Sequence, residues 1–171
     1  MNLDTKIRKI ALEDKNVGLL HGKMGACIYL YTVSDHDEPS CAYQTAKELL
    51  AQIAKQLSSV KSIELDKGLI GLSLGFSYLI QNKYLQDSTG EWIDAIDAYI
   101  YKVVMRTTET DLGGKELLSL VDALYYAIFR YKRLKNRYSK ELCLGNYILL
   151  GTKHSGGVYS CHLLTFLQRQ L

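Results

Sequence analysis

The sequence has almost no proline and no long run of apolar residues. Pro39 is the only proline among 171 residues, and because proline interrupts helices, its scarcity permits long continuous ones. No uncharged stretch reaches the roughly 18 apolar residues that a membrane-spanning helix needs. Residues 1–16 lack the apolar run of a secretory signal peptide. We therefore expect a cytoplasmic protein with no membrane partner.

Cysteine and net charge are also modest. The four cysteines form no CxxC pair, which argues against a zinc ribbon or a dithiol redox motif. In a cytosol these thiols are expected to stay reduced. A net charge of +3 is too small to indicate binding to nucleic acid or to an anionic membrane.

What the sequence does contain is ordinary globular composition with helical periodicity. The hydrophobic share is 47% and the charged share 23%, which fits a single domain over residues 1–171 with a real core. Apolar residues recur every three or four positions, as in Ala46, Leu49 and Ile53, and no segment alternates like a half-buried strand. The class predicted is all-α, with helices over residues 3–13, 17–33, 39–59, 67–85, 90–106, 114–135, 139–151 and 156–169.

An internal repeat is the most informative feature. The stretch GLLHGKMG (18–25) aligns with GLIGLSLG (68–75), pairing Gly18 with Gly68 and Gly25 with Gly75 at an offset of 50 residues (from 18 to 68). Weaker echoes begin near residues 111 and 155. Repeats of this length are typical of arrays of helical hairpins.

The glycines of each stretch fall at helical spacing. Gly18, Gly22 and Gly25 are separated by four and three residues, so on a helix they share one face. Such a stripe lets two helix backbones approach closely, which offsets the poor helix propensity of glycine. We expect α/α-hairpin repeats that form a partial α/α toroid.

The motif GLLHGKMG resembles the repeat motif of the lanthionine synthetase C-like family. That resemblance implies an α/α toroid, one zinc ion, and cyclisation of dehydrated peptides by addition of cysteine thiols. The chain departs from the family in having room for fewer hairpins. It also has Leu163 after Cys161 and His162, where the family has the glycine of a zinc-binding Cys-His-Gly motif. The resemblance therefore implies a short or partial member, peptide-binding or accessory, without a complete catalytic zinc site.

Three residues are candidates for chemistry. His21 can act as a catalytic proton donor or acceptor; the alternative is a histidine at a helix N-terminus that is hydrogen-bonded to a neighbouring loop. Cys161 and His162 are the candidate zinc ligands. The alternative there is a buried cysteine beside a partly exposed histidine.

Several functions and partners stay open from the sequence. The basic run RYKRLKNRYSK (130–140) fits either phosphate binding or the cationic end of a helix, and we expect no nucleic-acid partner. The 13 tyrosines fit either a peptide-binding cleft or packing between helices. The expected partner is a peptide substrate or another protein, and an open arc of repeats favours a homo-oligomer. The alternatives are a zinc-dependent cyclase completed by oligomerisation and a non-catalytic scaffold.

Overall fold

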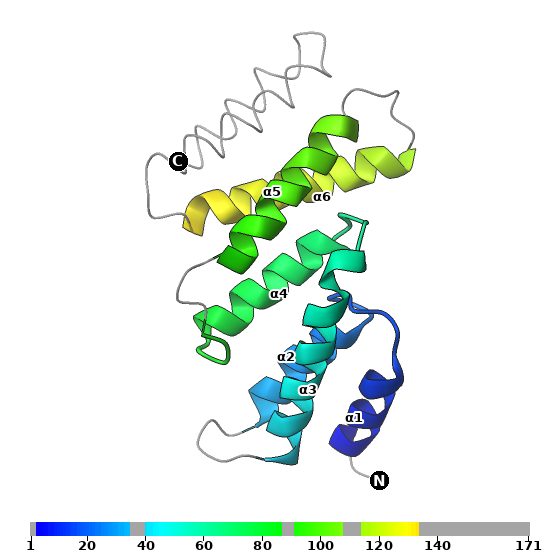
Figure 1. The fold of residues 1–171 in the computed structure, drawn as a ribbon, viewed down its shortest axis with the longest axis vertical. Coiled ribbons are helices and arrows are strands. Elements are labelled where there is room, and N and C mark those ends of the chain that lie inside the picture. The colour runs from blue at the N-terminus through cyan, green and yellow to red at the C-terminus, as the bar shows by residue number, and fades with distance from the viewer. Residues whose placement is uncertain (1–2, 35–39, 87–90, 108–113, 134–171) are drawn as a thin grey trace. The chain divides into compact units, whose positions relative to one another are not determined.

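The computed structural model describes residues 3–34, 40–86, 91–107 and 114–133, and this part of the chain contains helices and no strand. The elements are α1 (Leu3–Glu13), α2 (Lys23–Val33), α3 (Cys41–Gln56), the short 3-10 helix η1 (Leu57–Ser59), α4 (Leu69–Gln81), α5 (Glu91–Thr107) and α6 (Gly114–Arg133) (Figure 1). The all-α prediction is confirmed for these residues. The helices predicted over 139–151 and 156–169 lie outside them.

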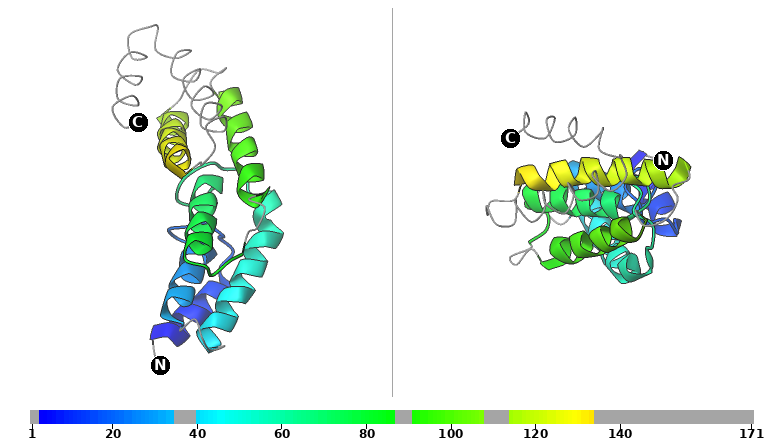
Figure 2. Two further views of the ribbon diagram at one scale, coloured as in Figure 1. Left: turned by 90° about the vertical axis from the view of Figure 1, so that its left-hand side faces the viewer. Right: turned by 90° about the horizontal axis from the view of Figure 1, so that it is seen from above.

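The chain forms two compact units, residues 1–98 and residues 99–171. Helices α1 to α4 belong to the first unit and α6 to the second, while α5 crosses the division. Figure 2 shows the helices from two further sides. None of the described helices is long and apolar enough to cross a bilayer. The prediction of a single domain over residues 1–171 stays a prediction.

Within the first unit, α2 and α3 pack side by side and antiparallel. The Lys23 ammonium at the start of α2 donates to the Gln52 side chain near the end of α3. At the other end of α2, the Tyr31 and Tyr43 rings meet edge to face, with centroids 5.5 Å apart. Since residue numbers rise along α2 while those of its partners fall along α3, the two helices run in opposite directions.

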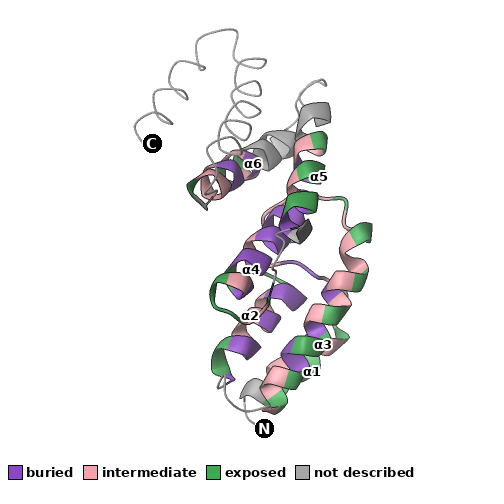
Figure 3. Ribbon diagram, turned by 60° about the vertical axis from the view of Figure 1, so that its left-hand side comes forward, coloured by how far each residue is buried: buried purple, intermediate pink, exposed green. Residues whose placement is uncertain are grey.

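Helix α2 is the centre of the first unit, because α1, α3 and α4 all contact it. Its residues Met24, Cys27 and Leu30 are completely buried. Buried residues also cover most of α4 but only one side of α3 (Figure 3). The apolar stripe predicted for α3 is confirmed at three of its positions, since Ala46, Leu49 and Ile53 are fully buried.

The predicted start of the second helix is wrong. Helix α2 begins at Lys23 rather than at residue 17, so residues 17–22 form a loop. On α6, Val121 is 56% exposed, and Ala123, Tyr126 and Ala127 are buried.

Helix α4 ends in a Schellman motif that has lysine where glycine is usual. Lys83 has a positive φ of 61°. The Tyr84 N–H donates to the Leu79 carbonyl at 2.9 Å, and the Lys83 N–H donates to the Ile80 carbonyl at 3.1 Å. This turn places the Tyr84 ring against the Tyr31 ring, with centroids 5.2 Å apart, so that the end of α4 is fixed to α2.

Replacing Lys83 with glycine is predicted to stabilise the protein. Glycine adopts a left-handed conformation without the Cβ clash that costs other residues about 1 kcal/mol or more. We expect Lys83→Gly to raise the free energy of unfolding in urea by about 1 kcal/mol. Lys83→Ala is the matched control, because it removes the same charge and keeps the Cβ; equal stabilities of the two variants would contradict the prediction.

Candidate functional site

The loop before α2 is held together by Asn16. The Asn16 side chain accepts a hydrogen bond from the Gly18 N–H at 2.9 Å and donates one to the His21 carbonyl at 2.7 Å. Its own carbonyl accepts from the Lys23 N–H at 2.9 Å. One residue therefore fixes the start, the tip and the end of the loop, and it also satisfies an N–H group that the helix leaves without a partner.

Glycine is required where this loop folds back onto α2. A Cβ placed on Gly25 would lie 2.3 Å from the carbonyl oxygen of Leu19, and one placed on Gly22 would lie 2.6 Å from the backbone nitrogen of Gly18. These neighbours are backbone atoms, which cannot rotate away as a side chain can. The predicted glycine stripe on one helix face, bringing two helix backbones together, is wrong here: Gly18 and Gly22 precede α2, and the close contact joins a loop to the first turn of its own helix.

The loop before α4 has the same local structure. The Ser62 hydroxyl accepts from the Glu64 N–H at 3.2 Å, and the Ser62 carbonyl accepts from the Leu69 N–H at 2.9 Å. A Cβ on Gly71 would lie 2.1 Å from the Leu65 carbonyl oxygen, just as one on Gly25 would meet that of Leu19. We call residues 16–22 the first glycine loop and residues 62–68 the second glycine loop.

These matches fix the register of the repeat at 46 residues instead of 50. Gly22 and Gly68 are the N-cap residues of α2 and α4, and Gly25 and Gly71 both stand three positions later. The alignment of Gly18 with Gly68 predicted from the sequence is therefore wrong by one helical turn. In the corrected register, Val17 matches Ile63 and Met24 matches Ile70, and all four side chains are buried.

The two glycine loops dock on each other through their backbones. The carbonyl oxygen of Asp66 accepts from the Leu19 N–H at 2.8 Å and from the Leu20 N–H at 3.2 Å. A Cβ on Gly18 would lie 2.5 Å from the Cα of Lys67. Residues 18–20 of the first loop thus lie directly against residues 66–67 of the second.

The helices that follow these loops also meet at a glycine. A Cβ on Gly75 of α4 would lie 2.4 Å from Cγ and 2.6 Å from the sulfur of Met24 on α2. The thioether of Met24 therefore fills the space over Gly75. Unlike the contacts of Gly25 and Gly71, this one involves the end of a flexible side chain.

His21 lies at the tip of the first glycine loop rather than on a helix. Its side chain is exposed, and its backbone carbonyl is the group that Asn16 binds. Leu20, beside it, is 61% exposed. The histidine that was predicted as a proton donor or acceptor on a helix face is therefore presented on a fixed, solvent-facing loop, next to an apolar side chain.

The candidate zinc ligands Cys161 and His162 lie outside the described residues. Within residues 3–34, 40–86, 91–107 and 114–133, no three histidine, cysteine or acidic side chains gather in a way that would hold a metal ion. Zinc binding at Cys161 and His162 stays a prediction.

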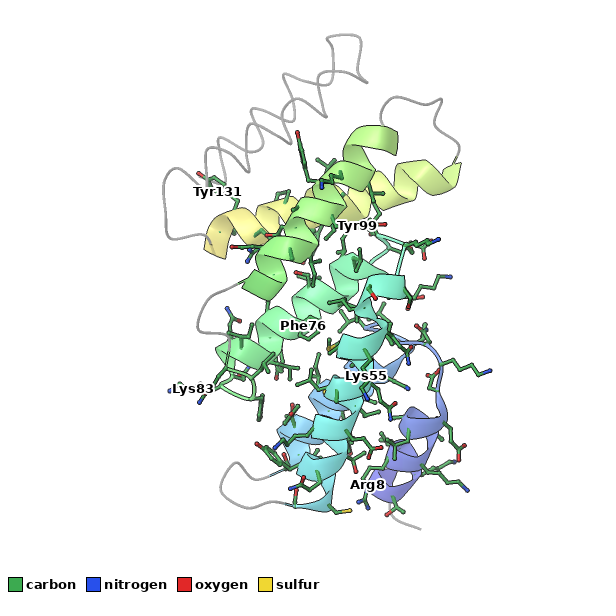
Figure 4. The ribbon with its side chains drawn as sticks, viewed as in Figure 1. Arg8, Lys55, Phe76, Lys83, Tyr99 and Tyr131 are labelled. Atoms are coloured by element: carbon green, nitrogen blue, oxygen red, sulfur yellow. The ribbon has the colours of Figure 1, made fainter. Side chains whose placement is uncertain are left out.

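The two described cysteines differ in environment. Cys27 is completely buried, its thiol donates to the Ala46 carbonyl at 3.4 Å, and burial raises its pKa to about 12. At neutral pH it is a protonated core residue and no nucleophile. Cys41, at the first position of α3, is exposed and accepts a hydrogen bond from the Arg8 guanidinium. Figure 4 labels Arg8 on α1.

Sequence reasoning missed the residues that build the site. Asn16 and Ser62 were not predicted to have a role, although each begins a seven-residue segment that ends in an N-cap glycine. Asn and Ser bind nearby backbone groups readily. The spacing from Asn or Ser to the first glycine of a GxxG pair is the signal that identifies these loops.

We compared the chain with known proteins at the level of family models, curated sequences and solved structures, and none of the three comparisons yields a match.

The backbone contacts of the glycines predict a graded response to alanine. Gly25→Ala and Gly71→Ala push a Cβ into a backbone carbonyl, and we expect each to lower the free energy of unfolding by about 3 kcal/mol. Gly75→Ala moves only Met24 and gains helix propensity, so we expect a change within about 1 kcal/mol. Urea unfolding followed by circular dichroism measures all three, and a Gly71→Ala variant as stable as Gly75→Ala would contradict the packing described here.

Burial of Cys27 predicts a loss of stability in alkali. The unfolded thiol ionises near its ordinary pKa of 9.0, while the folded one stays protonated up to about 12. The stabilisation is therefore complete below pH 9 and falls between these values, by at most about 1.4 kcal/mol per pH unit. Urea unfolding of the wild type between pH 8 and pH 10 is expected to show a steeper decline than that of Cys27→Ala, and parallel declines would refute the assignment.

Proposed function

We propose that this chain is a short lanthionine synthetase C-like protein that binds a peptide and does not cyclise it. In this proposal the two glycine loops and their helices are units of α/α-hairpin repeats in a partial α/α toroid. The observation that carries the proposal is the docking of the two loops through backbone atoms at Gly18 and Asp66. The motif on which the family resemblance is based is the same segment that makes this contact.

The geometry of the first glycine loop supports a binding role. Leu20 and His21 are exposed, yet their backbones are held on one side by Asp66 and on the other by Asn16. Binding residues are commonly carried on loops that a rigid scaffold positions. A loop that is already ordered loses little conformational entropy when a ligand binds, so an apolar side chain and an imidazole fixed in this way favour recognition of a peptide.

The departure at Leu163 supports an accessory role over catalysis. A catalytic zinc ion needs three protein ligands and one open position, and Cys161 with His162 supplies two candidates. The alternative is a zinc-dependent cyclase in which an oligomer completes the ligand set. A non-catalytic scaffold without peptide affinity is the third function, and the experiment below separates all three.

The proposal predicts peptide binding without cyclisation. The probe is a fluorescein-labelled synthetic peptide that contains one dehydroalanine and one cysteine, and fluorescence anisotropy with the full chain measures its affinity. Leu20→Ser is expected to weaken binding about tenfold, because a leucine contact contributes on the order of 1.5 kcal/mol. Gln44→Ala, on the exposed side of α3, is the matched control and should bind like the wild type.

Cyclisation and metal content are read in the same samples. A cyclised peptide no longer reacts with iodoacetamide, and we expect the cysteine of the probe to remain fully reactive. Near-stoichiometric zinc in the purified protein that is lost in Cys161→Ala, together with cyclisation, would replace the proposal by the zinc-dependent cyclase. Absence of binding would replace it by the scaffold. Light scattering on the same protein tests the expected homo-oligomer.

A further inference from the structure

Each residue of the first glycine loop corresponds to the residue 46 positions later in the second glycine loop. On the second loop, the edge formed by Asp66 and Lys67 is covered by Gly18–Leu20 of the same chain. At the offset of 46 residues, the counterpart of this edge on the first loop is formed by Leu20 and His21. The contact at Asp66 and Lys67 therefore indicates what kind of segment can bind at Leu20 and His21.

The counterpart edge is open. Leu20 is 61% exposed and His21 is exposed as well. In the described part of the chain, no group donates a hydrogen bond to the carbonyl oxygen of Leu20, whereas the matching oxygen of Asp66 accepts two. A backbone acceptor that has no partner within the described residues, on an exposed residue of a fixed loop, can accept from two N–H groups of an incoming segment.

The residues around the two edges decide how large that segment is. Gly25 matches Gly71, beside which the Cβ of Leu19 packs, so the loop part of the docking surface is retained. At the offset of 46 residues, Tyr29 on α2 corresponds to Gly75 on α4, over which the Met24 side chain lies. The tyrosine side chain leaves less space there for a helix that follows the docked segment. The edge is therefore suited to a short segment, bent as residues 18–20 are, instead of a complete loop and helix.

A second copy of this chain is a poorer occupant than a free peptide. The segment that would dock, Gly18–Leu20, is already bound to Asp66 of its own chain. To dock on a second copy, this segment would have to break its two hydrogen bonds to Asp66 in order to form two new ones. A free peptide has no such hydrogen bonds to break.

We propose that the Leu20–His21 edge binds a bent peptide segment that contains a glycine followed by two residues with free backbone N–H groups, the first of them apolar, in the manner in which Gly18–Leu20 binds Asp66. The peptide donates two successive N–H groups to the Leu20 carbonyl and lays its glycine against the Cα of His21. This inference depends on the proposed peptide-binding function and locates the site for it.

The test uses the capped synthetic peptide Asn-Val-Gly-Leu-Leu-His, which has the sequence of residues 16–21, added to the ¹⁵N,¹³C-labelled full chain. We expect chemical-shift changes confined to Leu20, His21 and their neighbours in the first glycine loop, including the carbonyl carbon of Leu20. The carbonyl shift distinguishes backbone recognition from contact with the imidazole alone.

Three variant peptides test the chemistry of the contact. N-methylation of the first leucine removes one donated N–H, and we expect about tenfold weaker binding. Glycine to alanine introduces a Cβ that has no room at the docked Gly18 and should weaken binding at least as much. N-methylation of the valine is the matched control, because the Val17 N–H makes no hydrogen bond among the described residues, and it should leave the affinity unchanged.

Each other outcome overturns the inference. Shifts at residues 66–67 would show that the peptide displaces the chain's own loop instead of binding the open edge. Shifts elsewhere, or equal affinity of all four peptides, would leave the proposed peptide-binding function standing and remove this site. No binding of this peptide, while the dehydroalanine peptide binds, would show that the glycine-containing segment is not what the protein recognises.

Discussion

The first unit of this protein depends on contacts between backbones that leave no room for a side chain. The first turn of α2 lies against the carbonyl of Leu19, the first turn of α4 lies against that of Leu65, and the Asp66 carbonyl joins the two loops. Glycine costs helix stability, up to about 1 kcal/mol relative to alanine. The chain carries that cost where a loop must fold back onto a helix, and the gain is a set of backbone hydrogen bonds that order both loops.

Because both loops are held in one conformation, they fix which residues the surface of the first unit presents. Because Asn16 holds the first loop from inside and Asp66 holds it from the second loop, Leu20 and His21 face solvent from a fixed backbone. The interior has the opposite character. Cys27 and Tyr31 are buried among α2 and α3, and burial raises the pKa of each, so neither offers an ionised group at neutral pH. In this unit the exposed and ordered residues Leu20 and His21 lie on a loop, and the helices support both loops.

Much of the fold was predictable from periodicity, but the site was not. The helix over residues 3–13 matches α1 at both ends, and the buried positions of α3 follow from the spacing of its apolar residues. The repeat is also visible in the sequence, yet the alignment of GLLHGKMG with GLIGLSLG pairs Gly18 with Gly68 and Gly25 with Gly75. The structure shows that Gly18 is a docking residue and Gly68 an N-cap. A sequence alone does not distinguish two reasons for glycine, whereas the hydrogen bonds of Asn16 and Ser62 do.

Amide hydrogen exchange measured by NMR tests the backbone docking most directly. In these loops the N–H groups of Leu19, Lys23 and Leu69 are bonded to Asp66, Asn16 and Ser62. We expect their exchange to be slowed to the level of the buried residues of α2 and α4, because opening them requires separating the two loops. Exchange at the rate of an open surface loop at Leu19 and Lys23, with α2 itself protected, would contradict the docking and the surface inferred from it.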